Sequence, residues 1–131
     1  MYKIVIDANV WIRFARAKDI SPLLKRMLLY NFVPIVNNYL LAETFDAIIQ
    51  YKWMNEKQAL MLVNLITSVG IVKAGKAVYA LSPDYKDNYL FDLGVQNNCV
   101  FIISDDLKLL SFKMKPLPVK SCNWFLKQFP L

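Results

Sequence analysis

Apolar runs rich in β-branched residues alternate with helical patterns along the chain, and this alternation limits the possible folds most strongly. The clearest runs are "YKIVI" at 2–6 and "CVFIIS" at 99–104. Between them, 37–52 and 55–69 carry apolar residues at helical spacing, and each segment begins with asparagine, a good helix cap. Strands that alternate with helices predict βαβ units and a parallel sheet. The sequence therefore predicts an α/β fold.

The remaining elements continue the same pattern. We expect further helices over 8–17, 21–31, 84–98, 105–112 and 122–129, and further strands over 32–36, 70–74 and 117–121. Ser121 or Cys122 is the expected cap of the last helix. Pro34 predicts that 32–36 lies at an edge of the sheet or at a strand end. No linker or repeat interrupts the 131 residues, so we expect a single domain over 1–131.

Several classes of function are excluded by composition. The chain has no histidine, which removes histidine-based catalysis and histidine metal ligands, and its three glycines form no phosphate-binding loop. Its longest uncharged run, 58–72, is too short to span a membrane, and the N-terminus does not resemble a signal peptide. Cys99 and Cys122 have no metal-binding spacing, so we expect free thiols in a reducing cytoplasm.

The net charge of +6 suits either a polyanionic partner or a surplus that aids solubility. No acidic residue follows Asp106, whereas lysines from Lys108 onward continue to the C-terminus. Arg13 and Arg16 are spaced to share one helix face. Lys108, Arg13 and Arg16 are candidate contacts for the phosphates of a polyanion, although two arginines on an ordinary exposed face would give the same pattern.

Carboxylates follow two of the predicted strands. Asp7 comes after "IVI", and Asp105 and Asp106 come after "FIIS". Ligands of open parallel sheets bind beyond the carboxyl ends of the strands, so these acids are expected at one edge. Either Asp105 or Asp106 must also cap the helix that follows.

Other acids have structural alternatives. Glu43 lies in an apolar helix, where a carboxylate is either exposed or buried with a partner. In "SPDYKDNYLFD", Asp84 is a good N-cap, Asp87 either complements the helix dipole or binds a ligand, and Asp92 is predicted to be a solvated surface charge.

Four carboxylates from different elements could thus converge at one edge: Asp7, Glu43, Asp87 and Asp106. Without a cation they would repel one another and raise each other's pKa values. Hard divalent cations such as Mg²⁺ or Mn²⁺ prefer such oxygen ligands, and one or two ions would support phosphodiester hydrolysis without histidine.

In order and spacing, these motifs resemble the PIN-domain family of ribonucleases. "IVIDANVW" resembles the family's first strand and acid, and "LLAETFDAI" resembles the helix with the second acid, Glu43. "DYKDNYLF" resembles its D-x-x-D-N helix, which makes Asp87 the third acid. "SDD" at 104–106 takes the place of T-G-D, which makes Asp106 the fourth and puts Asp105 where the family has glycine. That position therefore either tolerates a left-handed backbone or adds a fifth carboxylate.

The resemblance implies a three-layer α/β/α sandwich with a mainly parallel central sheet and metal-dependent cleavage of RNA. The four acids would hold the metal, while Asn9, Ser104, Asp84 and Asp105 would support them. At this length it also implies a toxin of a toxin–antitoxin pair, inhibited by a small antitoxin protein and present as a homodimer.

Other interpretations remain possible. A haloacid-dehalogenase phosphatase needs a second aspartate where this chain has Asn9, and a receiver domain needs an acidic pair and a mid-chain aspartate that we cannot place. A catalytically silent PIN-like module that binds RNA or protein is the main alternative.

Overall fold

A parallel sheet forms the centre of the molecule. The computed structural model describes residues 1–78 and 85–131, except for the side chains of residues 85 and 86. The five strands have the order β3-β2-β1-β4-β5, and every neighbouring pair is parallel. They are β1 (Tyr2–Ile6), β2 (Phe32–Val36), β3 (Ile71–Val72), β4 (Ile102–Ile103) and β5 (Val119–Lys120). The prediction of an α/β fold with a parallel sheet is confirmed.

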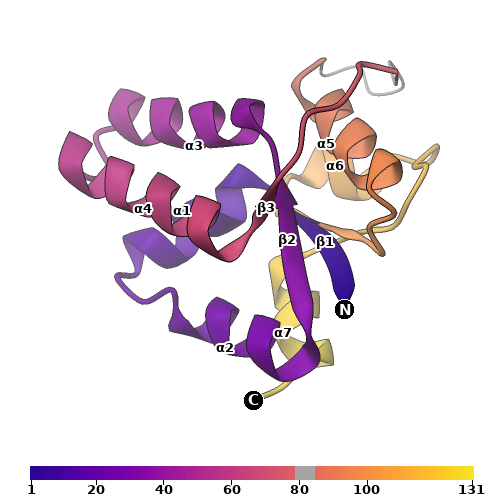
Figure 1. The fold of residues 1–131 in the computed structure, drawn as a ribbon, viewed down its shortest axis with the longest axis horizontal. Helices are drawn as coiled ribbons and strands as arrows, with labels where there is room; N and C mark the ends of the chain where they lie inside the picture. Colours follow the sequence, from indigo (N-terminus) through magenta and orange to yellow (C-terminus); the bar gives the residue numbers. More distant parts are fainter. Residues whose placement is uncertain (79–84) are drawn as a thin grey trace.

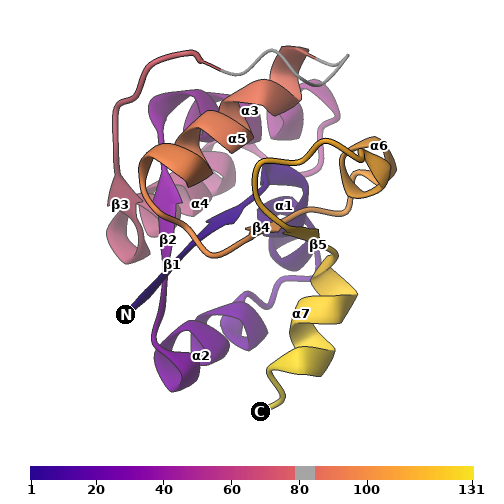
Figure 2. The ribbon, with the colours of Figure 1, turned by 90° about the vertical axis from the view of Figure 1, so that its right-hand side faces the viewer.

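Helices cover both faces of this sheet (Figures 1 and 2). They are α1 (Ala8–Arg16), α2 (Ser21–Tyr30), α3 (Asn38–Gln50), α4 (Glu56–Val69), α5 (Tyr85–Gln96), α6 (Leu107–Ser111) and α7 (Cys122–Gln128). Figure 1 shows α1, α3 and α4 on one side of the strands and α5 and α6 on the other.

The alternation of side chains in β1 explains why there are two cores. Ile4 and Ile6 point to one face and pack with α1, α2, α3, α4 and α7. Val5 points to the opposite face and packs with Leu90 and Phe91 of α5 and Leu109 of α6. Because successive side chains of a strand alternate, an apolar run on both faces requires layers on both sides. The three-layer sandwich is therefore confirmed.

The prediction that Pro34 lies in an edge strand or at the end of a strand was wrong, because Pro34 is in the middle of an internal strand. Strand β2 lies between β3 and β1, with Pro34 opposite Ile4 of β1. Strand β3 pairs only with Ile35 and Val36, which come after the proline, so the missing N–H does not interrupt that pairing. A Cβ on Gly70, just before β3, would lie 2.9 Å from the carbonyl oxygen of Pro34, so this close approach requires glycine.

Polar side chains mark several helix starts as the sequence predicts. Asn37 and Asn55 cap α3 and α4, the latter with a reciprocal bond to Gln58, and Ser121 caps α7. Over residues 1–78 and 85–131, none of the helices combines the length and apolar character that crossing a bilayer requires.

Candidate functional site

Asp7 lies where β1 passes into α1. It caps α1, because its side chain accepts a hydrogen bond from the Ala8 N–H at 2.7 Å. Only 5% of its surface is exposed. A buried carboxylate needs strong hydrogen bonds or a cation to remain ionised.

Ser104 and Asn9 join Asp7 to the end of β4. The Ser104 hydroxyl donates to Asp7 Oδ2 at 2.8 Å and accepts from the Asp106 N–H at 3.1 Å. Asn9 Nδ2 lies 3.3 Å from Asp7 Oδ2, and Asn9 Oδ1 accepts from the Asp105 N–H at 3.2 Å. The two strand ends that the sequence places at one edge are therefore linked directly.

The two neighbouring aspartates after β4 have different partners. Asp106 is half-buried and caps α6 by accepting from the Lys108 N–H at 2.9 Å. Asp105 turns to α1 and α7, where it accepts from the Cys122 N–H at 2.9 Å and pairs with Arg13 at 3.3 Å. Its backbone is not left-handed. Asp105 therefore ties three elements together, and both of its carboxylate oxygens have partners outside the network of Asp7.

Electrostatic effects show that further acids lie near Asp7. Burial raises the pKa of Asp7 from 3.8 to about 6, the hydrogen bond from Ser104 opposes this, and the negative charges of Glu43 and Asp106 add to it. Burial together with Asp7 and Glu43 also raises the pKa of Tyr89, which keeps this hydroxyl protonated. Asp7 at the end of β1, Glu43 in α3 and Asp106 after β4 therefore lie close enough for their negative charges to interact.

Asp87 is buried in the first turn of α5, with 7% of its surface exposed. Asp84, the predicted cap or supporting residue, lies outside the described residues. Among the residues that the structure does describe, no three acidic or cysteine side chains are close enough to form a ready metal cage. Asp7, Glu43 and Asp106 therefore lie near one another without forming a tight cluster.

Comparison with known proteins identifies the family. The model of the PIN domain matches residues 3–108, which is most of the chain. This chain belongs to the PIN-domain family. A search of curated proteins gave no significant match. PIN domains are typically nucleases and generally bind divalent metals.

The side chains at this site offer the type of ligand atom that such a metal binds. Its acids offer only oxygen ligands, which Mg²⁺ and Mn²⁺ prefer. Burial raises the pKa of Asp7, and the negative charges of Glu43 and Asp106 add to this, so a cation would offset part of the cost of ionising Asp7. The side chains would have to close further around an ion, since the described residues form no cage.

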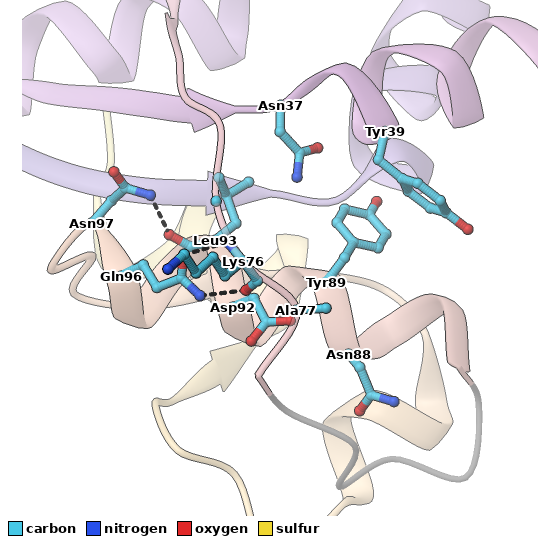
Figure 3. A pocket seen from close by; sticks show the side chains of 11 residues that line it. Asn37, Tyr39, Lys76, Ala77, Asn88, Tyr89, Asp92, Leu93, Gln96 and Asn97 are labelled. Carbon is cyan, nitrogen blue, oxygen red and sulfur yellow. Dashed lines mark hydrogen bonds between the residues drawn. The ribbon is translucent and has the colours of Figure 1, made fainter.

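A small hollow of about 210 Å³ lies beside α5, bordered by Tyr89 and Tyr39, whose ring centroids are 4.6 Å apart (Figure 3). Its wall is held by Gln96, which bonds to the N–H and the carbonyl oxygen of Lys76 at 3.1 and 2.6 Å. Asp92 accepts from the Val78 N–H at 3.0 Å. We call these bonds the α5 clasp.

The α5 clasp overturns the prediction for Asp92. Only 8% of its surface is exposed, so it is not a solvated surface charge. The segment after β3 runs back across α5 and covers Asp92. This contact joins residues that are distant in sequence.

The predicted basic residues lie on different surfaces. Lys108 is exposed at the start of α6. Arg13 and Arg16 line an open groove of about 510 Å³, which we call the α1 groove. Its lining residues are Asn9, Ile12, Arg13, Arg16, Ala17 and Trp53. Sequence reasoning missed Trp53 and Tyr89, because a single aromatic residue carries no pattern that separates a site from ordinary packing.

Proposed function

We propose that this PIN domain is a metal-dependent ribonuclease that hydrolyses RNA phosphodiester bonds internally. The observation that carries the proposal is the buried Asp7, joined to Ser104 and surrounded by the charges of Glu43 and Asp106. A PIN domain with a buried carboxylate, whose pKa is raised by burial and further by neighbouring carboxylates, is suited to a divalent cation.

The metal ligands in this proposal are Asp7, Glu43, Asp87 and Asp106, holding one or two Mg²⁺ or Mn²⁺ ions. When bound, such an ion supplies the positive charge and the activated water that phosphodiester hydrolysis needs.

Each residue near the metal has a separate role. Ser104 and Asn9 orient Asp7 through their hydrogen bonds to Oδ2, so that its oxygens face the edge of the sheet. Glu43 completes the ligand set or accepts a proton from the attacking water at its carboxylate. Tyr89 remains protonated beside these anions, so its hydroxyl is available as a hydrogen-bond donor.

The finer biological role is also a proposal. We infer a toxin of a toxin–antitoxin pair, acting in the cytoplasm as a homodimer and inhibited by a small antitoxin protein. The match to the PIN domain supports the nuclease part of this role, and the two free cysteines suit a reducing cytoplasm. Lys108, Arg13 and Arg16 would contact RNA phosphates.

One experiment separates the enzyme from its main alternative. Purified protein is incubated with structured and unstructured RNAs in Mn²⁺ or in chelator, beside Asp7→Asn and the exposed control Asp46→Asn. Cleavage that needs Mn²⁺, disappears in Asp7→Asn and persists in Asp46→Asn would support the proposal. Equal cleavage by Asp7→Asn would reveal a contaminating nuclease.

The alternative is a catalytically silent PIN-like module that binds RNA or protein. The absence of a ready metal cage among the described residues favours it. RNA binding without cleavage under any metal condition would decide for this module.

A further inference from the structure

The α1 groove adjoins the candidate active site. One of its lining residues is Asn9, whose Nδ2 lies 3.3 Å from Asp7 Oδ2. Arg13 and Arg16, one helical turn apart, lie on the same wall. A chain that enters the groove would therefore run from the carboxylates past two guanidinium groups.

An aromatic pair lies at the far side of this groove. The rings of Trp53 and Tyr51, between α3 and α4, are stacked with centroids 5.0 Å apart and an interplanar angle of 22°. The guanidinium carbon of Arg16 lies 4.6 Å from the centre of the Trp53 ring. Tyr51 is 60% exposed, whereas Trp53 is half-buried and packs partly against the first core, so the stack lies between the core and the surface.

Arg13 and Arg16 differ in how firmly they are held. Arg13 pairs with Asp105 and donates to Asn123 Oδ1 at 3.1 Å, which fixes its position. Among the described residues, Arg16 forms no ion pair, and its guanidinium group rests on the Trp53 ring. Arg16 can therefore leave the indole without breaking a salt bridge.

We infer that Trp53 is a base-stacking site for single-stranded RNA, a conclusion that rests on the proposed ribonuclease function and extends it. An unpaired base takes the place of the Arg16 guanidinium on the indole, and Arg16 moves to an adjacent phosphate. Stacking of a base on an aromatic ring is generally stronger than the attraction of a cation to a partly exposed ring, so the exchange favours RNA.

The same geometry selects single strands. Bases of a duplex are already stacked on their neighbours, whereas unpaired bases can lie on aromatic rings. The groove offers both parts of such recognition, guanidinium groups for phosphates and a ring for a base, next to the acids that would cut the chain. A protein partner needs no such combination of features.

The test measures binding and cleavage separately. Binding of a labelled single-stranded oligoadenylate is measured in chelator, which prevents metal-dependent cleavage, and is compared with an abasic oligomer of the same length. The proteins are wild type, Trp53→Leu, Trp53→Phe and Arg16→Gln. The matched control is Trp124→Leu, which removes another half-buried tryptophan with a cation, Lys120, 5.1 Å from its ring centre.

The expected pattern follows from loss of stacking alone. Trp53→Leu should bind the oligoadenylate about tenfold more weakly and bind the abasic oligomer as the wild type does. Trp53→Phe should keep most of the preference for bases, and Arg16→Gln should weaken both oligomers equally. Trp124→Leu should bind both like the wild type. Thermal unfolding checks that each variant is folded, and Tyr51→Ala replaces Trp53→Leu if the latter is not.

Three results would overturn the inference. The first is an unchanged affinity of folded Trp53→Leu for the oligoadenylate. The second is equal binding of base-bearing and abasic oligomers by the wild type. The third is a concentration-dependent change in tryptophan fluorescence without RNA that is absent in Trp53→Phe, with no response to RNA, which would assign the surface to a second copy of the chain. Cleavage in Mn²⁺ is scored independently: its absence with stacking intact refutes only the nuclease, and its presence without stacking refutes only the base site.

Discussion

Ser104 controls Asp7 more directly than any other described side chain. It is fully buried, donates to Asp7, and also receives the N–H of Asp106. Its hydrogen bond to Asp7 favours the ionised carboxylate, so it opposes the burial that raises the pKa. One hydroxyl therefore keeps a buried acid closer to its charged form.

Ser104→Ala should raise the pKa of Asp7 further and lower the free energy of unfolding by about 2 kcal/mol, because a buried hydrogen bond to a charged group is lost. Carboxyl NMR titration and urea unfolding in chelator measure the two effects. Ser111→Ala is the matched control, since its exposed hydroxyl bonds only to carbonyl oxygens of α6. If both variants leave Asp7 unchanged, Ser104 does not tune it.

The pKa of Asp7 also predicts how stability depends on pH without metal. The folded pKa is about 6 and the ordinary value is 3.8, so the folded state binds the proton more tightly. Stability should therefore fall as pH rises from about 4 to 6, by at most about 3 kcal/mol from this residue. The difference in unfolding free energy between wild type and Asp7→Asn, measured in chelator across this range, isolates that contribution. A difference that does not change with pH would show that Asp7 ionises normally.

At the scale of elements, local signals predicted most helix starts correctly, whereas β3, β4 and β5 are shorter than the sequence predicts. Asparagine and serine caps act on the next turn of the chain, so Asn37, Asn55 and Ser121 could be recognised from sequence. Contacts between distant segments could not be predicted in this way. Pro34 is inside the sheet because β3 pairs only beyond it, and Asp92 is buried because the segment after β3 crosses α5.

The candidate site divides in the same way. The parallel sheet and the carboxyl-end rule predict that Asp7 and Asp106 meet at one edge, and Ser104 joins them. The partners of Asp105 depend on α7, which returns from the far end of the chain. Sequence alone therefore left Asp105 open between a fifth ligand and a backbone role, and its bonds to Cys122 and Arg13 are structural.

The α5 clasp gives a test at this scale. Gln96→Ala removes the two bonds to Lys76, so the amide of Lys76 should exchange with solvent faster, with little change in global stability because Gln96 is exposed. Hydrogen–deuterium exchange measures this effect, and Gln128→Ala is a control on another exposed glutamine. Equal protection of Lys76 in both variants would mean that Gln96 does not hold the segment.

In the whole molecule, two apolar cores hold a sheet whose carboxyl edge gathers negative charge within a basic protein. The sheet is fixed from both faces, since Ile4 and Val5 enter different cores. The edge can therefore hold repelling carboxylates at a cost to stability that the cores offset. A ligand that relieves this repulsion must stabilise the folded state, because it binds there and not to the unfolded chain.

Mn²⁺ should accordingly raise the melting temperature of this PIN domain. At a concentration about 100 times its dissociation constant, a bound ion adds about 2.7 kcal/mol, or about 10 °C for a domain of this size. The shift should be larger at pH 7.5 than at pH 5, because protonation of Asp7, whose pKa is about 6, competes with the ion. Differential scanning fluorimetry at matched ionic strength measures it. Asp7→Asn should lose most of the shift, whereas Asp46→Asn, an exposed acid on α3, should keep it. An equal shift in both variants would place the ion away from Asp7, and no shift in the wild type would mean that the carboxylates do not close around a metal.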